Sequence, residues 1–238
     1  MNTAQIHENT DSVRAFFDQW QIYRKIVAAD CLCHREETAA LARWLDAQGP
    51  VGRFADLACG DASFTAPLLA SRHPASYTGI DVSDVALSLA RKNTAALSCP
   101  KTFVCGDFLS ELEKDTNAFD TIYVGLSVHH LVKADKCRFF AAAARALGPG
   151  GRLAIYEPAM RPGESFDQFL GRSDRYCRQA CTTLDAGELE SLLNHIKTCD
   201  LPETSDDYGA MGRRAGFRSA SILFRDPQEL WVLMGFDL

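Results

Sequence analysis

Short apolar segments alternate with amphipathic ones between residues 51 and 157, and this alternation limits the folds open to the chain. Strands and helices in such alternation form a parallel sheet with helices on both faces. The apolar runs lack strict polar alternation, as expected for strands buried on both sides. The strands are expected over residues 54–58, 77–81, 102–105, 119–126 and 152–157. The helices between them are expected over residues 63–72, 83–93, 108–115 and 134–147.

Two more apolar runs, 220–226 and 229–236, lie close together at the C-terminal end. Asp226 and Pro227 favour a turn between them, so they are expected to pair as antiparallel strands. The predicted fold class is therefore α/β, a Rossmann-like, doubly wound and mostly parallel seven-stranded sheet with an antiparallel C-terminal edge.

Additional helices interrupt the alternation on either side of the predicted core. An apolar stripe from Val13 to Val27 and a second helix over 35–49 predict an N-terminal cap. Two amphipathic helices are expected over 164–181 and 186–199. The chain divides into an N-terminal helical cap (1–50), a Rossmann-like core (51–158), a helical insert (159–200), and a last helix with the strand pair (201–238).

Composition narrows the classes of partner. The 238 residues carry a net charge of -6, which disfavours nucleic acid as a partner. No apolar run approaches the roughly 18 to 20 residues that span a bilayer, so no membrane partner is expected. The polar N-terminus does not resemble a secretory signal, and nine cysteines then indicate reduced thiols in the cytoplasm. The sequence carries no signal for an oligomeric state.

Two groups of possible metal ligands stand out among the cysteines. Cys31, Cys33 and His34 form one group, and Cys177 and Cys181 form the other. Their spacings differ from those of zinc ribbons and fingers. We therefore expect no metal site and interpret these cysteines as thiols on helices.

The turn after the first predicted strand has the composition of a ligand-binding turn. Small residues at Ala58, Gly60, Ala62 and Ser63 let the backbone approach a ligand. In open parallel sheets, ligands bind beyond the carboxyl ends of the strands. Only one glycine is present, so the turn fits a nicotinamide fingerprint poorly.

Three carboxylates follow successive predicted strands. Asp56 lies in the first strand, Asp81 ends the second, 21 residues after Gly60, and Asp107 follows the third. A carboxylate at the second strand can accept two hydrogen bonds from a ribose diol. Each aspartate could alternatively cap a turn or helix. Their occurrence at the ends of three successive strands favours a binding site.

These motifs, in this order, resemble those of class I S-adenosylmethionine-dependent methyltransferases. The resemblance rests on DLACGDAS, GIDVS, CGDF, FDTIYVGLSVHHL and LGPGGRLAIYEP. It covers residues 54–158 well and the last 35 residues moderately. It implies S-adenosylmethionine as cofactor, S-adenosylhomocysteine as product, and substrate-binding elements in the N-terminal and inserted helices. We therefore expect residues 10–48 and 159–200 to close over the site.

The resemblance also implies roles for individual residues. Asp56 and the backbone around Ala58 and Gly60 would hold the methionine part of the cofactor. Asp81 would bind the ribose hydroxyls, and Val82 would pack on the adenine. Asp107 would accept from the adenine amino group, with the Phe108 backbone beside it.

Two positions depart from the glycine-rich turn of the family. Ala58 and Ala62 stand where glycines are usual. Alanine disfavours positive φ, so cofactor binding is expected to require negative φ at both positions.

Candidates for a catalytic base follow the fourth and fifth predicted strands. They are His129, His130 and Glu157. We expect His129 to have an ordinary pKa near roughly 6.5 and to accept a proton from the methyl acceptor. His130 could instead pack at the start of the next helix, and Glu157 could pair with Arg161.

The leading interpretation is methyl transfer to a small molecule by in-line displacement. One alternative is a methyltransferase for tRNA or protein, with a basic face near the pocket formed by Arg172, Arg175, Arg178, Arg213 and Arg214. Another alternative is a partner subunit that binds the cofactor without turnover.

Overall fold

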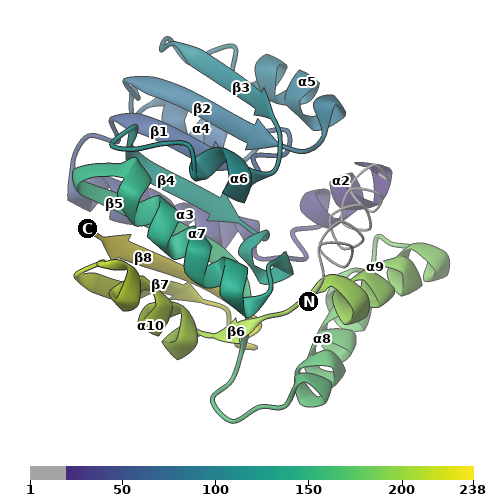
Figure 1. The fold of residues 1–238 in the computed structure, drawn as a ribbon. Coiled ribbons are helices and arrows are strands. Elements are labelled where there is room, and N and C mark those ends of the chain that lie inside the picture. The colour runs from purple at the N-terminus through teal and green to yellow at the C-terminus, as the bar shows by residue number, and fades with distance from the viewer. Residues whose placement is uncertain (1–19) are drawn as a thin grey trace.

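The computed structural model describes residues 20–238, so the part of the N-terminal stripe before Trp20 lies outside the described residues. A mostly parallel sheet forms the centre of the molecule (Figure 1). Its strands run in the order β3-β2-β1-β4-β5-β8-β7. The bounds are β1 Arg53–Leu57, β2 Ser76–Asp81, β3 Lys101–Cys105, β4 Phe119–Gly125, β5 Leu147–Met160, β7 Ser219–Arg225 and β8 Trp231–Asp237.

The pairing of these strands confirms the predicted fold class. β1 to β5 pair in parallel, and β8 pairs antiparallel with both β5 and β7. An eighth strand, β6 (Glu203–Thr204), was not predicted and pairs in parallel with the end of β5. Its two residues are too few to show a periodic pattern.

Helices cover both faces of the sheet. On one face lie α3 (His34–Gln48), α4 (Thr65–Ala70) and α5 (Asp84–Asn93), which contribute to one hydrophobic cluster. On the other face lie α6 (Phe108–Leu112), α7 (Lys133–Ala146) and α10 (Ser205–Ala215), which contribute to a second. Strands buried between two such layers need apolar residues on both sides, which explains their continuous apolar runs.

The remaining helices gather beyond the carboxyl ends of the strands (Figure 1). They are α2 (Trp20–Ala28), α8 (Phe166–Ala180) and α9 (Ala186–Cys199). α8 and α9 each begin with a capping box, formed by Ser165 with Gln168 and by Asp185 with Glu188. Among the described residues, no helix is long and apolar enough to cross a membrane.

β5 is longer than the sequence indicated. It begins at Leu147, includes the glycine-rich turn at 148–151, and continues past Glu157 to Met160. Glu157 therefore pairs with Val232 inside the strand and does not end it. The extension is stabilised by pairing with β8 and β6, which local sequence patterns do not report.

Candidate active site

A single cavity joins the turn after β1 to the helices beyond the sheet. Ala58, Gly60 and Asp81 line one end of it, and Ile196 of α9 lines the other. Val82, Asp107, Phe108, His129 and His130 also line it, and so do Ile26, Leu32, Cys177, Leu192, His195, Asp200 and Trp231.

The turn after β1 keeps a left-handed backbone despite its alanines. φ is 50° at Ala58, 53° at Gly60 and 55° at Ala62. The negative φ that cofactor binding was expected to require is therefore absent at both alanines, which instead adopt the left-handed backbone that glycine adopts without strain. The turn is fixed by backbone hydrogen bonds, in which Cys59 N–H donates to Ile80 O at 2.9 Å and Ala62 N–H donates to Cys59 O at 2.9 Å. These bonds and the surrounding packing offset a cost of roughly 1–2 kcal/mol for each left-handed alanine.

Asp81 connects this turn to the second strand. Its Oδ2 accepts a hydrogen bond from Gly60 N–H at 2.8 Å, and its Oδ1 accepts one from Ser83 N–H at 2.9 Å. The cap of α5 is Ser83, whose Oγ accepts from Ala86 N–H at 3.3 Å. Burial raises the pKa of Asp81, although the backbone donors oppose that effect. Each carboxylate oxygen has two lone pairs, so Asp81 can still accept from a ligand in the cavity.

Asp107 lines the cavity and also caps a helix. Its Oδ1 accepts a hydrogen bond from Ser110 N–H at 2.8 Å, which makes it the N-cap of α6. The capping interpretation and the binding interpretation are therefore compatible. Phe108 follows as the first residue of α6 and is 9% exposed.

Asp56 does not line the cavity, contrary to a direct role in holding the cofactor. It is 2% exposed and accepts hydrogen bonds from the Thr65 hydroxyl and, at 2.7 Å, from the Tyr77 hydroxyl. Burial raises its pKa to about 7. Because Thr65 is the first residue of α4, Asp56 fixes the turn from beneath.

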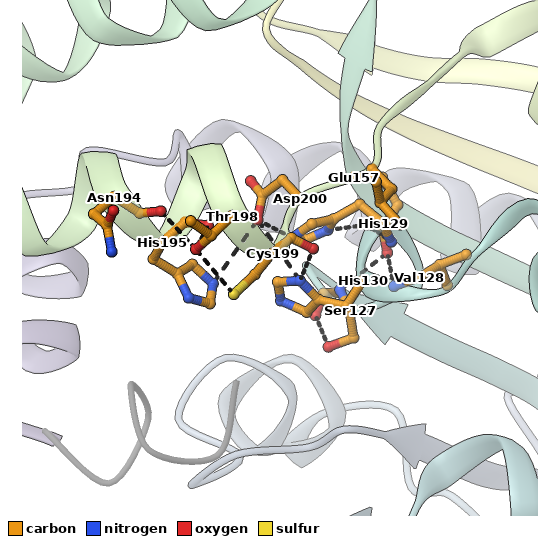
Figure 2. A network of polar contacts seen from close by, with 12 residues as sticks. Ser127, Val128, His129, His130, Glu157, Asn194, His195, Thr198, Cys199 and Asp200 are labelled. Carbon is orange, nitrogen blue, oxygen red and sulfur yellow. Dashed lines mark hydrogen bonds and ion pairs between the residues drawn. The ribbon is translucent and has the colours of Figure 1, made fainter. Parts of the chain in front are cut away.

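His129 lies between two carboxylates (Figure 2). It belongs to the short 3-10 helix η1 (Val128–His130), which follows β4. Its Nδ1 is 2.6 Å from Glu157 Oε2, and its Nε2 is 3.5 Å from Asp200 Oδ1. Burial lowers the pKa of His129, but the charges of Asp200 and Glu157 outweigh burial and raise it to about 9. The expectation of an ordinary pKa is therefore wrong.

Glu157 fixes η1 and does not line the cavity. Its carboxylate accepts from the N–H groups of Ser127, Val128 and His129 at 3.2, 2.9 and 3.1 Å. The alternative in which Glu157 pairs with Arg161 does not hold, because Arg161 Nε lies 2.7 Å from Glu229 Oε2. A buried carboxylate with these four contacts is held as a structural acceptor.

Asp200 is the centre of a group that the sequence analysis missed. Its Oδ1 is 3.6 Å from His130 Nδ1 and 3.8 Å from His195 Nε2. We call His129, His130, His195 and Asp200 the His–Asp cluster (Figure 2). Burial lowers the pKa of His195 to about 4, and burial also places that of His130 well below its usual value. One sequence signal was available, because His195 falls on the same helical face as Leu192, Ile196 and Cys199.

The other residues singled out in the sequence lie elsewhere. Burial lowers the pKa of His34 to about 4, and its ring stacks on Phe64 with the centroids 4.0 Å apart. The two cysteine groups lie side by side, because Tyr176 donates from its hydroxyl to Cys31 O at 2.8 Å and Cys31 Sγ donates to Ala180 O at 3.6 Å.

The predicted basic face does not line the cavity. Arg172 is 8% exposed and pairs with Glu164, while Arg178 pairs with Asp174 and Glu190. None of the five predicted arginines is among the lining residues. Arg213 and Arg214 are in α10, which packs on α7 and β7.

Comparison with known proteins finds a methyltransferase domain in part of the chain. Residues 54–151 match the family model described as a methyltransferase domain. These residues run from β1 into β5 and include the turn, Asp81 and Asp107. This part of the chain is therefore similar to a methyltransferase domain.

One curated relative is the phthiotriol/phenolphthiotriol dimycocerosates methyltransferase of Mycobacterium leprae. It is 32% identical over 114 residues, which are 47% of this chain and 40% of that protein. The chain thus spans less than half of this relative's length.

Solved structures share the fold. One is a Thermotoga maritima S-adenosylmethionine-dependent methyltransferase, described as a possible histamine N-methyltransferase. Its TM-score is 0.61 at 18% sequence identity, and the match covers 94% of this chain and 98% of the Thermotoga chain. Another is a protein of Bordetella parapertussis, described as a possible exported protein, with a TM-score of 0.62 at 21% sequence identity. This match covers 86% of this chain and 66% of the Bordetella chain.

Proposed function

We propose that the chain transfers a methyl group from S-adenosylmethionine to a small-molecule acceptor. The observation that carries this proposal is the single cavity that joins Gly60 and Asp81 to the His–Asp cluster. One end has the backbone and carboxylate groups that suit the cofactor. The other end lies under α8 and α9 and suits an acceptor.

The residues around the turn fit the cofactor. Ala58 and Gly60 expose backbone to the cavity, Asp81 has remaining acceptor capacity for ribose hydroxyls, and Val82 offers an apolar surface for the adenine. We infer that Asp107, which lines the cavity, accepts from the adenine amino group beside the Phe108 backbone. Asp56 contributes indirectly, since it holds Thr65 and thereby the start of α4.

The chain contributes chiefly alignment to the reaction. The bound cofactor supplies an electrophilic methyl group on a sulfonium, which an acceptor attacks in line. Holding two reactants in this geometry is worth up to roughly 7–11 kcal/mol in well-oriented systems. His129 favours its protonated form between Asp200 and Glu157, so it is suited to donate a hydrogen bond to the acceptor.

The apolar residues of the cavity favour a small acceptor with an apolar part. Ile26, Leu32, Leu192, Ile196 and Trp231 all line it. We infer that α2, α8 and α9 form this acceptor pocket and act as its lid. The M. leprae relative is named for phthiotriol and phenolphthiotriol dimycocerosates, and the T. maritima protein is described as a possible histamine N-methyltransferase, so neither name refers to RNA or protein as acceptor. A macromolecular acceptor is less favoured, because Arg172 and Arg178 are already paired with carboxylates.

The proposal is tested with S-adenosylmethionine labelled at the methyl group. The full chain is incubated with metabolite, RNA and protein fractions from cells, and the label is followed in each fraction. Label that appears in the metabolite fraction only when the folded chain is present supports the proposal. Label confined to RNA or protein supports the macromolecular alternative, and tight cofactor binding without transfer to any fraction supports the non-catalytic one.

A further inference from the structure

The His–Asp cluster brings together donor atoms from two distant parts of the chain. His129 and His130 come from η1, while His195 comes from α9 and Asp200 follows directly after it. Asp200 Oδ1 is 3.5, 3.6 and 3.8 Å from His129 Nε2, His130 Nδ1 and His195 Nε2. One donor atom each from His129, His130 and Asp200 lies within 4.8 Å of the others.

These separations suit an ion with tetrahedral coordination. Zinc binds histidine nitrogen and carboxylate oxygen at about 2.0–2.2 Å, and two ligands of a regular tetrahedron are then about 3.3–3.6 Å apart. The measured distances from Asp200 are close to this edge. An ion bound by His129, His130 and Asp200, whose ligand atoms all lie within 4.8 Å of one another, therefore needs only modest movements of these side chains. His195, which lies outside this group, has to move further to become a fourth ligand.

Asp200 Oδ1 is buried at the centre of the cluster and makes no hydrogen bond of ordinary geometry within the described part of the chain. The histidine nitrogens that face it lie at ion-pair distances of 3.5–3.8 Å. A buried carboxylate is costly unless it is paired or binds a metal, so either a protonated His129 or a metal ion in place of that proton stabilises it. Asp200 also lines the cavity, which gives an ion a route to the cluster.

Glu157 prepares His129 for the same role. Its carboxylate lies 2.6 Å from His129 Nδ1 and can accept from the Nδ1–H, so that Nε2 faces Asp200 and can bind an ion once the ion has displaced the Nε2 proton. Metal-binding histidines usually donate their other ring N–H to a carboxylate or carbonyl in this way. His130 Nδ1 lies 3.3 Å from Cys199 O and donates to it when protonated there. Coordination through Nδ1 would therefore move the proton to Nε2 and replace this hydrogen bond.

We propose that His129, His130 and Asp200, with His195 as a fourth ligand, bind a divalent transition-metal ion such as Zn²⁺. The nitrogen and oxygen donor set fits zinc better than magnesium or calcium, which prefer oxygen ligands alone. The sequence suggested no such site, because its ligands are separated by 65 positions between His130 and His195. An ion on His129 Nε2 would replace the proton that His129 otherwise offers to the acceptor. Alignment of cofactor and acceptor does not depend on the ion, so the two proposals can still fail separately.

The test measures metal directly on the full chain. Protein stripped with a chelator is dialysed against Zn²⁺ and then against buffer, and zinc per chain is measured by mass spectrometry. We expect one ion per wild-type chain, and no retained ion in Asp200→Asn or His129→Gln. His73→Gln, an exposed histidine outside the cluster, should bind like the wild type. Glu157→Gln should weaken binding by about 10- to 100-fold while leaving the ligands in place.

Two further measurements keep the result unambiguous. Thermal midpoint and affinity for S-adenosylhomocysteine verify that each variant is folded, independently of zinc. Co²⁺ in the site should give the visible spectrum of a tetrahedral nitrogen and oxygen set, without thiolate charge-transfer bands. Wild-type chain that retains no zinc, equal retention in Asp200→Asn, or a thiolate spectrum from the nine cysteines would overturn the proposal.

Discussion

Single residues set the shape of the turn that faces the proposed cofactor. At Ala58, φ is 50°, and the residue lines the cavity. A β-branched side chain tolerates positive φ much less well than alanine, whereas glycine adopts it without strain.

Ala58→Gly is therefore expected to bind S-adenosylhomocysteine as the wild type does, while Ala58→Val should bind at least about tenfold more weakly. Calorimetric titration gives both affinities, and thermal midpoints show whether the variants fold. Wild-type affinity in Ala58→Val would mean that the backbone of this position does not shape the site.

The sequence predicted the residues near this turn better than those across the cavity. Asp81 and Asp107 were found because each follows a strand, and strand ends are visible as breaks in apolar runs. Asp200 was missed because it follows an inserted helix, and only the fold brings it to His129. The role of Glu157 was misjudged, because its partners are the backbone N–H groups of η1.

Among the elements, α10 makes an unusually close approach to the sheet. A Cβ at Gly212 would lie 2.6 Å from the Phe236 ring of β8. A Cβ at Gly209, one turn earlier in the same helix, would meet only the Arg213 side chain within 3.4 Å. Both glycines lie inside a helix, where alanine is favoured by roughly 1 kcal/mol.

Gly212→Ala should consequently lower the free energy of unfolding by roughly 1–3 kcal/mol, because the overpacked ring must move. Gly209→Ala is the matched control and should be neutral or stabilising. Urea denaturation of both variants measures the difference. Equal stability of the two variants would contradict the close packing of α10 on β8.

The helices α8 and α9 are expected to respond to ligand. They contribute Cys177, Leu192 and Ile196 to the cavity, so closing over a bound molecule should slow their amide exchange. Hydrogen exchange with and without S-adenosylhomocysteine should show this, while α10, which does not line the cavity, should not change. Protection limited to the strand ends would refute the lid assignment.

Element types were predictable from the sequence, but their ends were less so. The alternation of strands and helices gave the correct fold class, since both faces of the sheet are covered. The length of β5 and the existence of β6 depend on pairing with distant strands. Periodicity within a segment carries no information on such pairing.

At the scale of the whole molecule, a buried acid makes stability depend on pH. Glu37 is 1% exposed, and burial raises its pKa to about 7 although Thr38 and Tyr123 donate to it. The pKa of Glu37 in the folded chain exceeds its value near 4.5 in the unfolded chain. The neutral side chain therefore makes its full contribution to the free energy of unfolding below about pH 4.5. The contribution is lost as pH rises through about 7, and amounts to roughly 3 kcal/mol.

The glutamine in Glu37→Gln cannot ionise, so this variant should not lose that stability as the pH rises. Its free energy of unfolding, relative to the wild type, should rise by roughly 3 kcal/mol between pH 5 and pH 8. The neighbouring exposed Glu36→Gln serves as the control and should follow the wild type. Urea denaturation across this pH range measures the difference. If the free energy of unfolding changed with pH in the same way for Glu37→Gln and wild type, the raised pKa of Glu37 would be ruled out.

The central claim is that Asp81 and the turn around Gly60 bind the cofactor of a methyltransferase. Calorimetric titration of S-adenosylhomocysteine into the folded chain tests it most directly. We expect one ligand per chain, with Asp81→Ala weakening binding by roughly 1.5–3 kcal/mol, about 10- to 150-fold, and with the exposed Asp84→Ala leaving it unchanged. Failure of folded wild-type chain to bind either S-adenosylhomocysteine or S-adenosylmethionine, or tight binding of a nicotinamide dinucleotide instead, would contradict the claim.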